Sequence, residues 1–333
     1  MKKLKYLQYA LHAAVLGGLI YAGMKYIDGD QFARAIRQFD WHYAPLVCLL
    51  GIASFFIKGW RFARLMRTLQ NASRGMLVRV YLAGQACAML PGGGAARAGM
   101  LKQAGIPVAE TAAPLAMSSL TDQILFVLCT LVAAFWFETA RRPLIVFLVG
   151  LALVSILLGI EAWRTWVLRL IEQLMDRFHW QEHWREFLDA LKTISTPRLL
   201  IGSVANTAVA FACLLLALHL TLRGVGVSVP FPHLLLAFAL PTMLGRISAL
   251  PGGVGVTEAG MIGVLGTIPN VSPDQAAAAV TVFRLGTVFF TALVGGLIYL
   301  FAWRGVEEAR HVRKGDAPVP AAPATDSELR VTH

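Results

Sequence analysis

The feature that most constrains the fold is a series of apolar stretches, each long enough to cross a membrane. About 20 apolar residues in a helix span a hydrocarbon core of roughly 30 Å. Charged residues make up only 15% of this chain, against about a quarter in soluble domains. The sequence therefore predicts an all-α polytopic membrane protein with about six full spans, at residues 7–27, 42–58, 112–137, 143–162, 198–222 and 275–302.

Two further apolar regions, 78–105 and 231–268, are each broken by a similar phrase of proline and glycine. The phrases are "MLPGGGAARAG" at 89–99 and "ALPGGVGVTEAG" at 249–260. Proline interrupts the hydrogen bonding of a helix, and glycine permits tight turns and close backbone approach. We expect each region to be a re-entrant hairpin, with Gly92 and Gly93 at the first turn and Gly252 and Gly253 at the second.

Basic residues in short loops predict the orientation of the chain, because cytoplasmic loops are rich in Lys and Arg. Three lysines precede the first span, and six basic residues with no acid fill 58–79. Further basic residues fill 163–197 and follow residue 302. These positions agree if both termini are cytoplasmic and if the two broken regions enter from opposite faces without crossing. A full crossing of either region would reverse the sidedness of everything after it.

The two broken regions lie in units that repeat, about 42–137 and 198–302. In the first unit, Arg97 lies six residues after Pro91 and Asp122 lies 31 after it. In the second, Glu258 lies seven residues after Pro251 and Arg284 lies 33 after it. The spacing is kept while the signs are exchanged. Opposite insertion of the hairpins makes this an inverted repeat, in which substrate binds near the membrane midplane.

The four repeated charges are the candidate binding residues. A charge near the bilayer centre costs about 2.5–3.5 kcal/mol, so these residues need partners or a wet cavity. An arginine beside glycine turns and a helix amino end favours a phosphate or carboxylate. Arg246, before the second turn, is a further candidate for which a structural role is the stronger interpretation. The alternative for the whole set is that it forms ion pairs that only hold the bundle together.

Outside the apolar units the sequence predicts little folded structure. Residues 163–197 alternate tryptophans with charges, which predicts amphipathic helices on the cytoplasmic surface. Residues 306–333 are rich in Pro and Ala and predict a disordered tail after a single transmembrane domain, 1–305. The net charge of +11 is assigned to cytoplasmic loops, so no nucleic-acid partner is expected.

The segments "LPGGGAARAGMLKQAGIP", "LTDQILF", "LPGGVGVTEAG" and "FRLG" resemble the lysylphosphatidylglycerol synthase transmembrane-region family of flippase-like proteins. The resemblance covers about residues 5–305, with Glu258 and Arg284 at the expected places. It departs at Gly94–Ala96 and at Ser118 and Ser119, where the family usually carries charged residues. The resemblance implies a membrane-lipid translocation role, known for aminoacyl-lipid members and suspected for members that handle glycolipids, polyprenyl lipids or hopanoids. For this chain we expect an anionic lipid, isoprenoid lipid or glycolipid in a bacterial cytoplasmic (inner) membrane. The aminoacyl-transferase domain of the full-length enzymes is not expected here.

Three classes of function remain open from the sequence. The leading hypothesis is a lipid translocase that moves a polar or anionic headgroup through a midplane site between the hairpins. An enzyme is disfavoured, because no hydrolase, metalloprotease or P-loop motif occurs, and we expect no catalytic residue, metal or cofactor. The alternative is a non-transporting membrane partner that anchors a lipid- or glycolipid-modifying enzyme.

Overall fold

The computed structural model describes residues 29–87, 93–137, 181–248 and 250–302, together with a few single residues between 160 and 169. Within these ranges every regular element is helical. The elements are α2 (Gly29–Arg37), a 3-10 turn (Trp41–Tyr43), α3 (Ala44–Met66), α4 (Arg74–Ala83), α5 (Gly93–Gln103), α6 (Val108–Ala134), α9 (Gln181–Ile194), α10 (Pro197–Gly224), α11 (Phe231–Ile247), a 3-10 turn (Pro251–Gly253), α12 (Val256–Leu265), α13 (Pro273–Arg284), a π-helical segment (Leu285–Phe289) and α14 (Phe290–Ala302).

Four continuous helical stretches are long and apolar enough to cross a membrane. They are Trp41–Met66, Glu110–Ala134, Pro197–Gly224 and Pro273–Ala302. Each coincides with a predicted span, and together they confirm a multi-pass α-helical membrane protein. The predicted span 7–27 and the tail 306–333 lie outside the described residues, as does nearly all of 143–162. The total of six spans therefore stays a prediction.

The predicted end of the span 42–58 is wrong. Helix α3 continues to Met66, and both Lys58 and Arg61 lie inside it rather than in a loop. Sequence reasoning ended the span at its first cation, because an unpaired charge is costly in lipid. Arg61 is nevertheless only 1% exposed, because the fold supplies it with a buried carboxylate. Four further basic residues follow in the same region of the chain, so the predicted cytoplasmic side is unchanged: Arg64, Arg67, Arg74 and Arg79.

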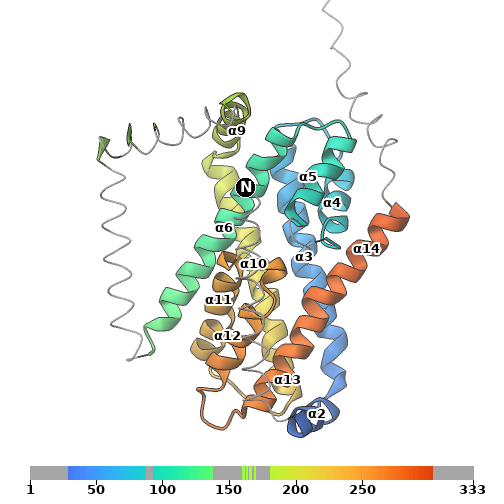
Figure 1. The fold of residues 1–333 in the computed structure, drawn as a ribbon, viewed down its shortest axis with the longest axis vertical. Coiled ribbons are helices and arrows are strands. Elements are labelled where there is room, and N and C mark those ends of the chain that lie inside the picture. The colour runs from blue at the N-terminus through green and yellow to red at the C-terminus, as the bar shows by residue number, and fades with distance from the viewer. Residues whose placement is uncertain are drawn as a thin grey trace, which may run out of the picture.

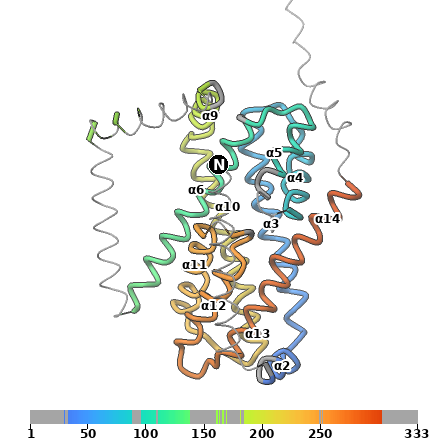
Figure 2. The backbone as a smooth tube through the Cα atoms, in the orientation of Figure 1, coloured from blue at the N-terminus to red at the C-terminus, as the bar shows by residue number. Residues whose placement is uncertain are grey.

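The long helices form an elongated bundle in which α3 and α10 pack side by side (Figure 1). Helix α3 begins at the end of the bundle where α2 lies, and α10 begins at the opposite end, where α9 lies. Each broken region is a pair of short helices, α4 with α5 and α11 with α12. The two pairs lie in opposite halves of the long axis (Figure 2). Residues 88–92, which include Gly92, lie outside the described residues, and Gly93 opens α5.

The turn between α11 and α12 depends on glycine. Gly252, Gly253 and Gly255 all have positive φ, of 62°, 65° and 88°, a backbone region that other residues rarely adopt. A Cβ on Gly253 would also lie 3.0 Å from the backbone of Gly245 in α11. The second "LPGG" phrase thus folds as a tight turn with its two arms in close contact.

The largest apolar cluster of the described residues joins elements of both sequence units, 42–137 and 198–302. Phe126 of α6, Phe211 of α10, Phe238 of α11 and Phe283 of α13 are buried. Their ring centroids lie 5.0–6.1 Å apart in successive pairs, the range in which aromatic rings attract one another. This cluster fixes α11 against the long helices and forms one wall of the cavity described below.

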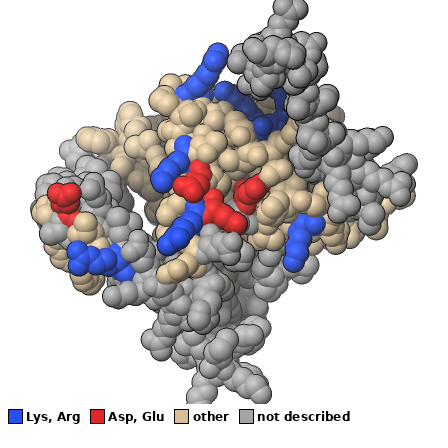
Figure 3. Space-filling view, turned by 90° about the horizontal axis from the view of Figure 1, so that it is seen from above, with Lys and Arg blue, Asp and Glu red and all other residues tan. Residues whose placement is uncertain are grey.

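Charged side chains gather at the end of the molecule where α4, α5 and α9 lie (Figure 3). Helix α9 buries Ala190 and Ile194 against Leu65 of α3 and apolar residues of α6, while Asp189 and Lys192 are exposed. This amphipathic helix occupies part of the segment 163–197, of which most of 163–180 is outside the described residues. Its cytoplasmic location stays a prediction.

Close packing of α14 on α4 gives a test of the fold. A Cβ on Gly295 would lie 2.5 Å from the carbonyl oxygen of Leu82, whereas a Cβ on Gly296 would make only a 3.9 Å contact with Ala86. We expect Gly295→Ala to lower the free energy of unfolding by about 1–3 kcal/mol through overpacking. Thermal unfolding in detergent measures the change, with Gly296→Ala as the matched control that unfolds at or above the wild-type temperature. Equal effects of the two substitutions would contradict this packing.

Candidate membrane-embedded binding site

The centre of the site is the carboxylate of Asp122, on α6. Its Oδ1 accepts a hydrogen bond of 2.7 Å from Nη1 of Arg61, and its Oδ2 accepts one of 3.0 Å from Nη2 of Arg246. The ammonium group of Lys58 lies 3.9 Å from Oδ2. One buried carboxylate thus receives cations from α3 and α11. Because α3 and α6 lie in the sequence unit 42–137 and α11 lies in the unit 198–302, the ion pairs of Asp122 connect the two units.

Arg61 is the most deeply buried of these cations. Besides Asp122, it donates hydrogen bonds to Thr207 Oγ1 of α10 and, over 3.3 Å, to the carbonyl oxygen of Ser118. These bonds connect three long helices through one guanidinium group. A buried ion pair of this kind is stable only when hydrogen bonds satisfy the remaining donors. The Nε of Arg61 nevertheless has no acceptor in the described part of the chain.

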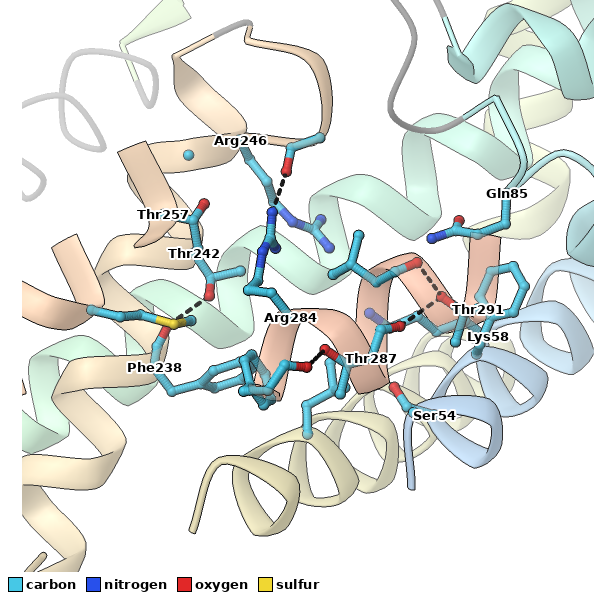
Figure 4. Close-up of a pocket in the computed structure, with 18 of the residues that line it drawn as sticks. Ser54, Lys58, Gln85, Phe238, Thr242, Arg246, Thr257, Arg284, Thr287 and Thr291 are labelled. Carbon is cyan, nitrogen blue, oxygen red and sulfur yellow. Dashed lines mark hydrogen bonds between the residues drawn. The ribbon is translucent and has the colours of Figure 1, made fainter. Parts of the chain in front are cut away.

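Glu258 and Arg284 form the second ion pair, with Oε1 of Glu258 2.5 Å from Nε of Arg284. The other oxygen of Glu258 accepts from the backbone N–H of Gly255 at 2.7 Å and so caps α12. Nη2 of Arg284 donates to the carbonyl oxygen of Gly252 over 3.2 Å (Figure 4). This pair therefore holds the glycine turn against α13. The helix changes to π geometry directly after Arg284, a distortion frequent at functional sites.

Arg97 of α5 differs from the other cations, because it pairs with no carboxylate among the described residues. Its Nη2 donates to Oε1 of Gln85 at 3.0 Å and its Nε to the carbonyl oxygen of Tyr81 at 3.3 Å. Its guanidinium carbon also lies 4.1 Å from the centre of the Tyr81 ring, within the range of a cation–π interaction. These neutral partners fix the position of Arg97 and leave its charge uncompensated.

These side chains line two adjoining cavities. One, here called the cationic lobe, has a volume of ≈ 350 Å³. The other, the hydroxyl lobe, has a volume of ≈ 190 Å³. They share Phe55, Lys58, Gln85 and Arg246. The cationic lobe adds Arg61, Tyr81, Arg97, Leu115, Ser118, Ser119 and Asp122. The polar lining of the hydroxyl lobe adds Ser54, Thr242, Thr257, Arg284, Thr287 and Thr291, several of which are seen in Figure 4.

Positive charge exceeds negative charge around the joined cavity. Five cations line it, namely Lys58, Arg61, Arg97, Arg246 and Arg284. The carboxylates that pair with them are Asp122 and Glu258. In a site surrounded by apolar helices, an excess of cations is costly unless water or an anion accompanies it. The arrangement therefore favours a negatively charged ligand.

The structure brings together most of the residues singled out from the sequence. Asp122, Arg97, Arg246, Arg284 and Gly252 line the joined cavity, Glu258 pairs with Arg284, and Gly253 lies in the turn beside it. Glu258 and Arg284 form an ion pair, as in the alternative left open from the sequence, whereas Arg97 pairs with neither carboxylate in the described ranges.

Sequence reasoning missed Lys58 and Arg61, because both were assigned to a loop. Their spacing of three residues places them on one face of a helix, and Asp122, inside the apolar span 112–137, needs a cationic partner. Those two signals together point to an extended α3. Arg246 was expected to have a mainly structural role; it lines both lobes and, like Thr207 of α10, contacts Asp122 from the unit 198–302.

Removing the buried carboxylate tests this network. We expect Asp122→Asn to lower the free energy of unfolding by about 3–5 kcal/mol, because it leaves Arg61 buried without a counter-charge. The matched control is Asp189→Asn, which removes an exposed pairing with Lys192 and should change stability by less than about 1 kcal/mol. Thermal unfolding in detergent compares the two. Similar unfolding temperatures for the two variants would argue against the network.

Comparison with known families agrees with the geometry. The family model described as "Lysylphosphatidylglycerol synthase TM region" matches residues 9–295. No curated protein matches the chain. The family match covers both helix pairs and all four long helices except the last turns of α14. It also covers every residue of the ion pairs around Asp122 and of the Glu258–Arg284 pair. The chain therefore belongs to the lysylphosphatidylglycerol synthase TM region family.

Proposed function

We propose that the protein is a lipid translocase that moves a polar or anionic lipid headgroup across the membrane through the joined cavity. The observation that carries this proposal is the composition of the cavity wall. Charged residues of both repeats meet there, inside a bundle whose long helices are apolar enough to span a membrane. Such a cavity offers a headgroup a polar path while the acyl chains stay in the surrounding lipid.

The two lobes offer different hydrogen-bonding groups. The hydroxyls of Thr242, Thr287 and Thr291 donate to backbone carbonyls of their own helices, which leaves their lone pairs as acceptors. The guanidinium groups of the cationic lobe are donors only. A headgroup with hydroxyls and a negative charge complements both lobes at once. A ligand with a net positive charge complements neither the charge nor the donors of the cationic lobe.

The opposite directions of α3 and α10 and the opposite positions of the two helix pairs support an inverted repeat with two re-entrant hairpins. In transporters of that architecture, one repeat rocks against the other around a fixed midplane site. The contact between Arg246 and Asp122 crosses the repeats, and the Arg246 side chain is 35% exposed. We infer that this contact opens and closes during transport, while Arg61 keeps Asp122 neutralised.

The proposed transport is not coupled directly to ATP, because the sequence carries no P-loop motif. A gradient or the downhill flow of the lipid supplies the energy instead. We place the protein in the cytoplasmic membrane of a bacterium and propose that the lipid leaves chemically unchanged. Recovery of the same lipid species by mass spectrometry after transport supports this, and a modified lipid would assign the chain an enzymatic role instead.

Reconstitution into liposomes tests transport. With fluorescent anionic lipid in one leaflet, we expect wild-type protein to move the headgroup faster than empty liposomes do. Arg97→Ala should slow this by about 10-fold or more, the effect of losing one charge-assisted hydrogen bond. Glu258→Gln should also slow transport, because it releases Arg284 and the glycine turn.

The matched control is Lys102→Ala, which removes a cation from the exposed face of the same helix as Arg97 and should transport at the wild-type rate. Equal transport rates for wild type, Arg97→Ala and Glu258→Gln would contradict the proposal that the lipid headgroup passes through this cavity. A wild-type rate equal to that of empty liposomes, with a lipid-modifying enzyme co-purifying in stoichiometric amount, would favour the anchoring role.

A further inference from the structure

We propose that the cationic lobe is a seat for a phosphate group with two negative charges, a phosphomonoester or a diphosphate. This inference deepens the proposed function. The part of it that assigns the phosphate to a lipid headgroup rests on that proposed function. Three features of this lobe support the proposal: its charges, its unpaired donors among the described residues, and the positions of its arginines.

The charge count of the lobe favours a dianion. Four cations line it, Lys58, Arg61, Arg97 and Arg246, and Asp122 is the carboxylate among its lining residues. After Asp122 neutralises one cation, three positive charges remain. A phosphodiester supplies one negative charge, whereas a phosphomonoester supplies about 1.5–2 at neutral pH. A zwitterionic headgroup would also bring a cation towards these three charges.

Two buried polar atoms of the lobe lack partners in the part of the chain that the structure describes. They are Nε of Arg61 and Oγ of Ser118. Both residues line the lobe and are less than a tenth exposed, at 1% and 6%. A buried donor without an acceptor costs roughly 1–3 kcal/mol, so such atoms are normally satisfied. A phosphate oxygen in the lobe would accept from both.

Arg97 and Arg246 are held in place, yet each has N–H donors for which no described residue is an acceptor. Arg97 uses Nε and Nη2 for Tyr81 and Gln85, and Arg246 uses Nη2 for Asp122 while lying 5.0 Å from the Phe126 ring centre. A guanidinium has five N–H donors, so each arginine retains a fork that fits phosphate oxygens. Both arginines line the cationic lobe, so we expect one phosphate bound there to contact a guanidinium group from α5 and another from α11.

Ligand titration of the full-length protein in detergent tests the charge preference. The probes are phosphatidate, phosphatidylglycerol and phosphatidylcholine with identical acyl chains, and inorganic pyrophosphate as the free ion. Thermal unfolding followed by tryptophan fluorescence reports binding, because a ligand of the folded state raises the unfolding temperature. We expect phosphatidate to bind about 10-fold or more tightly than phosphatidylglycerol, and phosphatidylcholine to give no shift. Equal shifts with all three lipids would overturn the proposal.

The variants Arg97→Gln and Arg246→Gln test the location. Each should weaken phosphatidate binding by about 10-fold or more, the loss of one charge-assisted hydrogen bond. Lys102→Gln, on the exposed face of α5, should bind as the wild type does. Arg97→Gln removes no ion pair of the described residues, so we expect it to fold. It therefore tests the location even if Arg246→Gln is unstable. Unchanged phosphatidate affinity in Arg97→Gln would overturn the proposal.

The pyrophosphate arm distinguishes the source of the phosphate. A pyrophosphate shift that Arg97→Gln reduces assigns the seat to free phosphates as well as lipids, and a shift with phosphatidate alone assigns it to lipids. The liposome assay separates this inference from the proposed function. Transport with no preference for phosphatidate would contradict the dianion site but support the translocase. Binding of phosphatidate without transport would support the dianion site but contradict the translocase.

Discussion

The ion pair between Arg61 and Asp122 is the interaction on which the rest of the site depends. It lies inside a bundle of membrane-length apolar helices, where neither charge is stable alone. Through Thr207 it also ties α10 to α3 and α6. Because Asp122 is fixed there, Arg246 can approach its second oxygen from the other repeat, and Lys58 can remain within 3.9 Å. The carboxylate held in this way lines the cationic lobe.

The two ion-pair groups have different consequences for function. Glu258 and Arg284 hold the glycine turn and the start of α12, and their charges balance one another. Around Asp122 the charges do not balance, and Arg97 has only neutral partners in the described residues. A purely structural network would minimise such an excess, since each uncompensated cation destabilises the bundle. The excess of positive charge therefore supports the proposal that the cationic lobe binds an anion.

The sequence predicted those parts of the fold that depend on local pattern. Apolar length identified the four long helices that the structure describes, and the proline–glycine phrases identified both breaks. The sequence marked Glu258 and Arg284 as candidate binding residues and left their ion pairing open as an alternative. It could not predict the end of α3, because Lys58 and Arg61 are stable in a span only through Asp122, 61 residues beyond Arg61 in the chain. Nor could it place Arg246, whose partner lies on the other repeat. Such contacts depend on how helices pack, which no local pattern contains.

The central claim is that the joined cavity binds an anionic lipid headgroup, and native mass spectrometry of the purified protein tests it most directly. The wild-type protein should retain one or more anionic lipids through gentle detergent extraction. The double variant Arg97→Gln/Arg246→Gln should lose those lipids while keeping the neutral ones. Identical bound lipids in both proteins, or only zwitterionic lipids on the wild type, would contradict the claim.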